Sequence, residues 1–183
     1  GSVEKDLIMS ATGKQKGLIL AFTGAGKGKT TAALGTALRM IARGGRVGMV
    51  RFLKSGAMES QALGKFGPKF RAWNFGGGFT WQVSLEENVK AVQEAWKRCR
   101  MLLRDPKYDL VIFDEIHIAL KYKFLKTTDV LKALKEKISS QHVVLTGRGA
   151  PKSILKVADL VTEMKCLKHP FQKGIPAQPG IDF

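Results

Sequence analysis

The stretch AFTGAGKGKTTAALG, residues 21–35, constrains the fold of this chain more than any other part of its sequence. A short apolar run, residues 17–22, leads into it, and an alanine- and leucine-rich run with helical spacing, residues 30–43, follows from its end. A strand, a glycine-rich loop and a helix in this order are the context of a phosphate-binding loop, in which backbone N–H groups at the helix start surround an anion. The sequence therefore predicts a nucleotide-binding α/β protein.

The spacing of this loop is one residue shorter than the usual pattern G-x-x-x-x-G-K-[ST]. Gly28 and Lys29 supply the end of the pattern, but Thr23 stands where its first glycine is expected, and the nearer glycine is Gly24. A glycine-rich turn that only starts a helix is the alternative interpretation, but the G-K-T-T sequence after an apolar strand favours phosphate binding. The predicted phosphate-binding residues are Gly24, Ala25, Gly26, Lys27, Gly28, Lys29, Thr30 and Thr31.

Strand-like and helix-like runs alternate along the rest of the chain. Further strands are expected at residues 46–53, 69–75, 108–115, 142–147 and 158–164. Further helices are expected at residues 84–103, which begin with a capping-box pattern, and at residues 127–138. Such alternation predicts a mostly parallel central sheet of about six strands with helices on both faces.

A second candidate site feature is an acidic pair at the end of the strand expected at residues 108–115, where Asp114 and Glu115 follow an apolar run. This is the form of a Walker B strand, whose acidic end meets the Mg²⁺ held by the loop threonine. Two acids that only end a strand are the alternative. Because ligands of open α/β sheets bind at the carboxyl ends of the strands, we expect Thr30, Asp114 and Glu115 to hold a magnesium ion together.

The composition limits the class of protein further. The 183 residues suit one domain, and 31 lysines and arginines against 15 acidic residues give a net charge of +16, which attracts polyanions. The basic residues are spread along the chain between apolar ones, so nucleic acid is not the expected partner. No apolar run approaches the length of a membrane span, and two distant cysteines predict reduced thiols in a cytoplasmic protein.

Two aromatic residues, Phe79 and Trp81, follow three glycines at residues 76–78. In an extended segment two residues that are two positions apart point the same way. The residues alone favour a pair of core aromatics. A ligand-binding loop is the alternative.

Several stretches together resemble the P-loop type ATP:corrinoid adenosyltransferases, the cob(I)alamin adenosyltransferase family. The resemblance covers nearly the whole chain after residue 16, in residues 23–39, 47–55, 77–81, 109–122, 143–151 and 158–183. It implies an α/β, RecA-like P-loop fold and a homodimer. It also implies transfer of the 5′-deoxyadenosyl group of Mg-ATP to the cobalt of a reduced corrinoid, with release of triphosphate. The reaction belongs to the biosynthesis or salvage of adenosylcobalamin.

The resemblance also assigns roles to residues, and the expected catalytic residues are Lys29, Phe79, Trp81 and Glu115. Phe79 and Trp81 are implied to pack against the lower face of the corrin ring and to displace the lower axial ligand. Loss of that ligand makes cobalt easier to reduce, because axial ligation controls metal potentials. Arg148, in the sequence T-G-R-G, is expected to bind a phosphate or a corrinoid side chain.

The domain prediction is a tag remnant and N-terminal extension at residues 1–16 and one P-loop adenosyltransferase domain at residues 17–183. Three features depart from the family pattern. Arg51 stands where glutamine is expected, Gln82 stands where glutamate is expected, and the segment before the phosphate loop is short. The high positive charge suggests docking of an acidic electron donor such as flavodoxin.

Two other functions remain open from the sequence. The first is a RecA-like ATPase stimulated by nucleic acid, which the fold and the charge suggest. The second is a small-molecule kinase, which requires an arginine-bearing lid that the sequence does not show.

Overall fold

The structure, a computed structural model, describes residues 16–53, 62, 64–75 and 84–181. Its strands are β1 (Ile19–Thr23), β2 (Val47–Arg51), β3 (Phe70–Asn74), β4 (Leu110–Asp114), β5 (His142–Thr146) and β6 (Leu160–Glu163). Its α-helices are α2 (Lys29–Ala42), α4 (Leu85–Leu103), α5 (Ile116–Lys121), α6 (Thr127–Glu136) and α7 (Lys152–Val157), and two 3₁₀ turns are η1 (Gly67–Lys69) and η2 (Pro170–Lys173).

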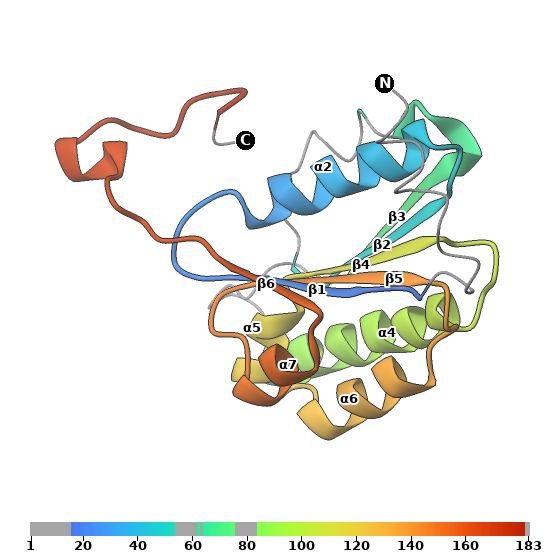
Figure 1. Cartoon of the computed structure of the whole chain (residues 1–183). Helices are drawn as coiled ribbons and strands as arrows, with labels where there is room; N and C mark the ends of the chain where they lie inside the picture. The colour runs from blue at the N-terminus through green and yellow to red at the C-terminus, as the bar shows by residue number, and fades with distance from the viewer. Residues whose placement is uncertain (1–15, 54–61, 63, 76–83, 182–183) are drawn as a thin grey trace.

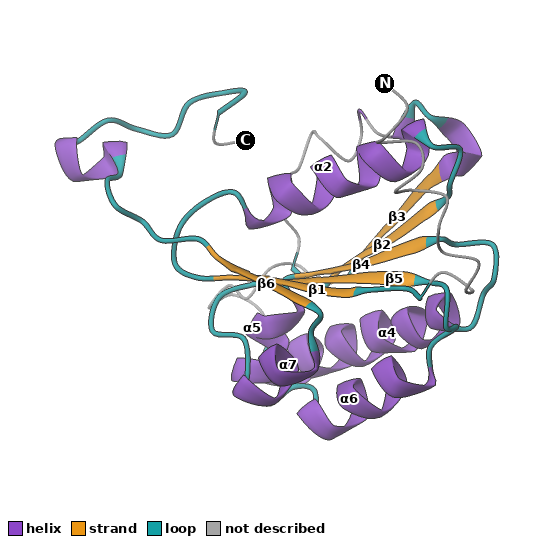
Figure 2. Ribbon diagram, viewed as in Figure 1, coloured by secondary structure: helices purple, strands orange, loops and turns teal. Residues whose placement is uncertain are grey.

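The strands form one sheet in the order β3-β2-β4-β5-β1-β6, and every neighbouring pair is parallel. Helix α2 lies on one face of the sheet, and α4, α5, α6 and α7 lie on the other (Figures 1 and 2). The predicted α/β fold with a six-stranded parallel sheet covered on both faces is therefore confirmed. The two short helices α5 and α7 were not predicted, because six residues are too few to show a helical period.

The core has one layer on each side of the sheet because successive side chains of a strand point to opposite faces. On the α2 side, Leu34 and Ile41 pack with strand residues such as Met49 and Ile112. On the other side, residues of α4, including Trp96, pack with Val50, Phe113 and Leu145. The predicted capping box at the start of α4 is present: Ser84 Oγ accepts the Glu87 N–H at 3.1 Å, and Glu87 Oε2 accepts the Ser84 N–H at 3.2 Å.

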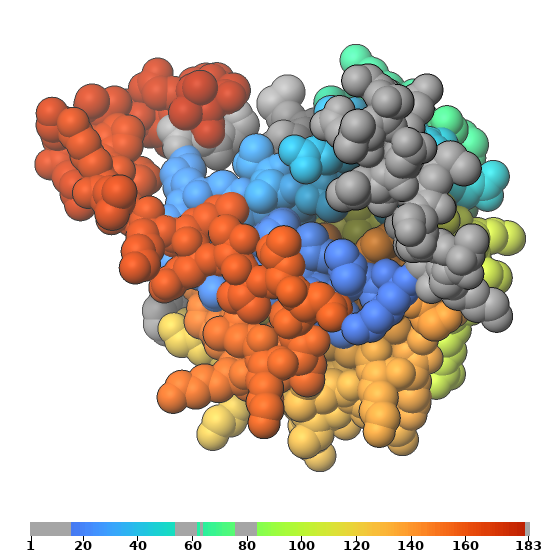
Figure 3. Space-filling view, viewed as in Figure 1, coloured from blue at the N-terminus to red at the C-terminus, as the bar shows by residue number. Residues whose placement is uncertain are grey.

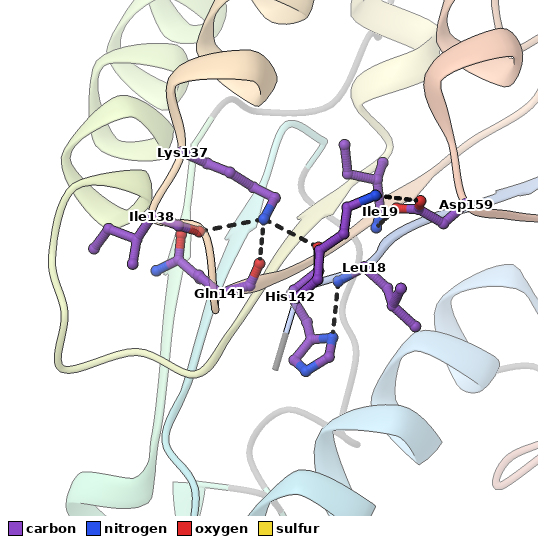
Figure 4. Close-up of polar contacts among 9 residues, drawn as sticks. Leu18, Ile19, Lys137, Ile138, Gln141, His142 and Asp159 are labelled. Carbon is purple, nitrogen blue, oxygen red and sulfur yellow. Dashed lines mark hydrogen bonds and ion pairs between the residues drawn. The ribbon is translucent and has the colours of Figure 1, made fainter. Parts of the chain in front are cut away.

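A group of polar contacts ties the amino ends of β1 and β5 together (Figure 4). Lys137 Nζ donates to the carbonyl oxygens of Gly17 at 3.2 Å and Gln141 at 2.7 Å. The Leu18 N–H donates to His142 Nδ1 at 3.1 Å, and the Ile19 N–H donates to an Asp159 carboxylate oxygen at 2.8 Å. These contacts fix the register in which β1 enters the sheet, and β1 leads directly into the glycine loop.

The chain beyond β6 runs away from the sheet, and η2 lies apart from the other helices (Figures 1 and 3). Several large apolar side chains of this segment are in contact with solvent. Leu167 is 92% exposed, Phe171 is 78% exposed and Ile181 is 80% exposed. Among the described helices, none is both long enough and apolar enough to cross a membrane.

We predict that His142 makes the stability of the fold depend on pH. Burial, and then the charge of Lys137, lower the pKa of His142 below its usual range, and the neutral ring must accept the Leu18 N–H. As the pH falls below the unfolded-state pKa of about 6.5, His142 becomes protonated in the unfolded chain but stays neutral in the folded chain. The free energy of unfolding therefore decreases. His142→Val should lose less stability between pH 7 and pH 5 than the wild type in urea unfolding. Equal losses would contradict this role.

Candidate nucleotide-binding site

The glycine loop connects β1 to α2 and takes backbone conformations that favour glycine. Gly24 has φ of 99° and Gly28 has φ of 107°. The loop also lies directly against the end of β6, because the Gly26 N–H donates to the Met164 carbonyl at 2.7 Å. A Cβ atom on Gly24 would lie 2.3 Å from that same carbonyl oxygen. The position of the loop therefore depends on glycine and on the neighbouring strand.

Lys29, the first residue of α2, closes the loop with its side chain. It is buried, and its ammonium group donates to the carbonyl oxygens of Gly24 at 2.9 Å and Gly26 at 2.6 Å. Burial lowers the pKa of Lys29, and the nearby charge of Glu115 opposes this effect. The loop therefore has a cation held on its inner side, where a phosphate group would lie.

Asp114 receives two side-chain hydrogen bonds from different elements. Its Oδ1 accepts the Thr30 hydroxyl from α2 at 2.9 Å and the Thr146 hydroxyl from β5 at 2.7 Å. Arg51 is its register partner on β2, and the Arg51 Nε lies 3.6 Å from Asp114 Oδ2. The carboxyl ends of β2, β4 and β5 thus present a row of polar side chains beneath the start of α2.

Glu115 follows β4 in a left-handed conformation, with φ of 62°. This conformation costs a non-glycine residue about 1–3 kcal/mol and is common at functional sites. The Glu115 N–H donates to Thr146 Oγ1 at 2.9 Å. Burial, and then the charge of Asp114, raise the pKa of Glu115, while Lys29 and Arg148 oppose the rise. Arg148 is exposed, and its charge acts on both Lys29 and Glu115.

The donor atoms near Asp114 suit magnesium. The Thr30 hydroxyl and the carboxylates of Asp114 and Glu115 supply hard oxygen ligands, and Mg²⁺ typically binds to one or two carboxylates together with substrate phosphates. In the part of the chain that the structure describes, no three His, Cys, Asp or Glu side chains gather into a metal cluster. With one or two carboxylates as protein ligands, Mg²⁺ would take its remaining ligands from substrate phosphates and water.

The structure brings most of the sequence-predicted residues together. Lys29, Thr30, Asp114, Glu115 and Arg148 meet at the carboxyl ends of the strands, beside the loop glycines. Ala25, Lys27 and Thr31 are exposed residues at or beside the loop. Phe79 and Trp81, together with Gln82, lie outside the described residues.

Sequence reasoning missed the contact made by Thr146, and Arg51 was noted only as a departure from the family. The signal for Thr146 was its position at the end of an apolar strand next to the acidic strand. His117 lies behind the site: its Nδ1–H donates to the Gly147 carbonyl at 3.0 Å, and burial lowers the pKa of His117 to about 4. His117 is therefore neutral at pH 7 and supports the loop after β5.

Fold and site together define a P-loop nucleotide-binding protein. The family model described as ATP:corrinoid adenosyltransferase BtuR/CobO/CobP matches residues 15–183. The chain therefore belongs to the ATP:corrinoid adenosyltransferase family, as the motifs predicted.

Curated relatives agree with this family. A corrinoid adenosyltransferase of Sinorhizobium sp is 43% identical over 98% of this chain and 86% of the relative. Those of Escherichia coli K12 and Salmonella typhimurium are 40% and 38% identical, over 92% and 93% of this chain and 87% of each relative. A solved KaiC-like protein of Pyrococcus horikoshii OT3 has a TM-score of 0.49 at 17% identity, covering 81% of this chain and 73% of its own, and is too distant to support any functional statement.

We predict that Gly24→Ala weakens ATP binding at least tenfold, because the added Cβ forces the loop away from β6 and from its phosphate-binding shape. Isothermal titration calorimetry with Mg-ATP measures the effect. Gly35→Ala is the matched control: Gly35 lies within α2, and an added Cβ there meets no atom within 4 Å. An unchanged affinity in Gly24→Ala would show that the loop does not bind the nucleotide in this shape.

We predict that Thr146→Val lowers the free energy of unfolding by about 1–3 kcal/mol, the usual cost of leaving buried polar groups unpaired. The substitution removes one donor to Asp114 and the acceptor of the Glu115 N–H while keeping the side-chain volume nearly constant. Thr146→Ser retains the hydroxyl and should remain close to the wild type in urea unfolding. Wild-type stability in Thr146→Val would mean that the hydroxyl is dispensable.

Proposed function

We propose that this protein transfers the 5′-deoxyadenosyl group of Mg-ATP to the cobalt of a reduced corrinoid, cob(I)alamin or a precursor, and releases triphosphate. The match of the adenosyltransferase family model to residues 15–183 carries the proposal. The glycine loop with Lys29, and the carboxylates at the end of β4, supply the nucleotide site that the reaction requires. No finding favours an ATPase stimulated by nucleic acid.

The reaction breaks the bond between the 5′ carbon and the triphosphate oxygen and forms a bond between that carbon and cobalt. The electron pair of the new bond comes from reduced cobalt, and the pair of the broken bond leaves with the triphosphate. No proton has to be removed from the nucleophile, so a general base is not required. The task of the protein is to position the two substrates and to stabilise negative charge on the departing oxygen.

The positions of the loop residues suit this task. When a triphosphate enters, Lys29 can exchange its two carbonyl acceptors for phosphate oxygens, because its ammonium group already lies on the inner side of the loop. Arg148 adds a second positive charge near Glu115. Magnesium bound beside Thr30, at the acidic end of β4, would neutralise further charge on the leaving group. Because the whole triphosphate departs, the shortened loop need not present the γ-phosphorus for attack.

We further propose that Phe79 and Trp81 act on the corrinoid, packing against its lower face and removing the lower axial ligand.

We also propose one catalytic domain at residues 17–183, supported by the extent of the family match. A homodimer is supported by the exposed apolar side chains beyond β6, including Phe171. Docking of an acidic electron donor such as flavodoxin is supported by the net charge of +16. A cytoplasmic location stays a prediction.

The decisive experiment is an anaerobic assay with Mg-ATP and chemically reduced cob(I)alamin. We expect a light-sensitive adenosylcobalamin spectrum and one triphosphate for each corrinoid adenosylated. An unchanged corrin spectrum accompanied by ADP or inorganic phosphate would contradict adenosyl transfer. In that case, the rate of phosphate release would be measured again with DNA or RNA added, to test for an ATPase stimulated by nucleic acid.

We predict that Phe79→Ala and Trp81→Ala separate the reduction of cobalt from the transfer step. Each variant should lose at least tenfold in rate when cob(II)alamin and a reductant are supplied, because the lower axial ligand stays in place and cobalt is harder to reduce. Each should retain most of its rate with cob(I)alamin prepared in advance. Phe66→Ala is a control, since Phe66 is 45% exposed. Equal losses with both forms of cobalamin would contradict this role.

A further inference from the structure

Arg51 is the largest fully buried side chain in the described part of the chain, with a relative exposure of only 1%. Its charged group lies at the carboxyl end of β2, opposite Asp114 in the parallel register. A buried guanidinium is costly unless it is paired and fully hydrogen-bonded. Its presence beneath the nucleotide site therefore requires a reason.

The pairing of Arg51 is incomplete. The Arg51 Nε lies 3.6 Å from Asp114 Oδ2, which is an ion pair but too long for a hydrogen bond. Within the described residues, neither Nε nor Nη2 of Arg51 has a hydrogen-bond partner. The guanidinium thus acts on Asp114 through its charge.

The two oxygens of Asp114 face different groups. Oδ1 accepts the hydroxyls of Thr30 and Thr146, and Oδ2 faces Arg51. A carboxylate arranged in this way has its charge partly neutralised before any metal arrives. The adjacent Glu115 has no ion pair among the described residues at the salt-bridge distance, and its carboxylate lies next to Gly147, where an added Cβ would come within 3.2 Å of Glu115 Oε2.

We propose that Arg51 is a positioning residue that divides the work of the two carboxylates. Arg51 holds Asp114 as the acceptor that orients Thr30, and the direct bond to the divalent cation falls to Glu115. The fixed positive charge of Arg51 beside Asp114 also repels the cation. Arg51 therefore weakens metal affinity, while Asp114 keeps Thr30 in place. This inference rests on the proposed Mg-ATP site and concerns the one residue of the row that departs from the expected family pattern.

The first test measures binding of Mn²⁺, used in place of Mg²⁺, to the ATP-bound protein by the electron paramagnetic resonance signal of free Mn²⁺. Arg51→Gln should bind Mn²⁺ at least fivefold more tightly, because the positive charge of Arg51 no longer offsets the negative charge of Asp114. Arg51→Lys keeps the charge and should stay within twofold of the wild type. Arg71→Gln, an exposed arginine on the neighbouring strand β3, is the matched control and should not change the affinity.

Two outcomes of this measurement would overturn the proposal. An unchanged Mn²⁺ affinity in a folded Arg51→Gln protein would mean that Arg51 only fills the core. A weaker affinity would mean that Arg51 supports the metal site. A measurement of ATP affinity in EDTA, without metal, tests whether Arg51 contacts the phosphates directly. We expect the affinity of Arg51→Gln to stay within twofold of the wild type. A tenfold loss would mean that Arg51 binds the nucleotide and would contradict the proposal.

The second test begins in the wild-type background, so its first part does not depend on the folding of an Arg51 variant. Glu115→Gln in the wild-type background should weaken Mn²⁺ binding at least tenfold, and a change below twofold would overturn the assignment of the metal to Glu115. In the Arg51→Gln background the same substitution should have a smaller effect, since Asp114 without the charge of Arg51 contributes more to metal binding. All of these measurements omit the corrinoid, so the inference can fail while adenosyl transfer is observed, or hold while it is not.

Discussion

The arrangement of the nucleotide site depends on the carboxylate of Asp114. Its Oδ1 joins the first turn of α2 to the end of β5 through Thr30 and Thr146, and Asp114 itself ends β4. Three elements that are far apart in the sequence are therefore held at one point. Because buried acceptors of this kind are strongly destabilising when they lose their donors, the start of α2 cannot move without a loss of stability.

The start of the phosphate loop is held by a second set of contacts, backbone hydrogen bonds to the residue that follows β6. The Thr23 carbonyl accepts the Met164 N–H at 2.9 Å, and the Met164 carbonyl accepts the Gly26 N–H at 2.7 Å. The loop thus continues the hydrogen bonding between β1 and β6 beyond the sheet. The exposed segment after β6 begins at this contact, so the phosphate loop and the start of that segment are joined by direct hydrogen bonds.

The sequence predicted the fold well because its signals were local and repeated. Apolar runs of strand length alternated with amphipathic runs, and parallel pairing follows from that alternation. The helix α5 was missed because Glu115 turns the chain sharply, directly after a strand, into a helix of only six residues. No periodicity can emerge over so few positions.

The site was predicted less completely, for a different physical reason. Lys29, Thr30 and Asp114 belong to motifs in which neighbours along the chain reveal the role. The contacts of Thr146 and Arg51 depend on strand order and register, which bring β5 and β2 to either side of β4. Those long-range pairings are fixed by the packing of the whole sheet, and no short window of sequence contains them.

The balance of charge at the site connects the fold to the proposed chemistry. Lys29, Arg148 and Arg51 bring positive charge to the carboxyl ends of the strands, and Asp114 and Glu115 bring negative charge to the same place. A kinase must stabilise charge on a phosphoryl group in transfer, whereas adenosyl transfer develops charge on the oxygen that joins the triphosphate to the 5′ carbon. The second task needs cations around the whole triphosphate and no base near the nucleophile. A loop closed by a buried lysine, with the carboxylate of Asp114 already engaged by Thr30, Thr146 and Arg51, meets that requirement.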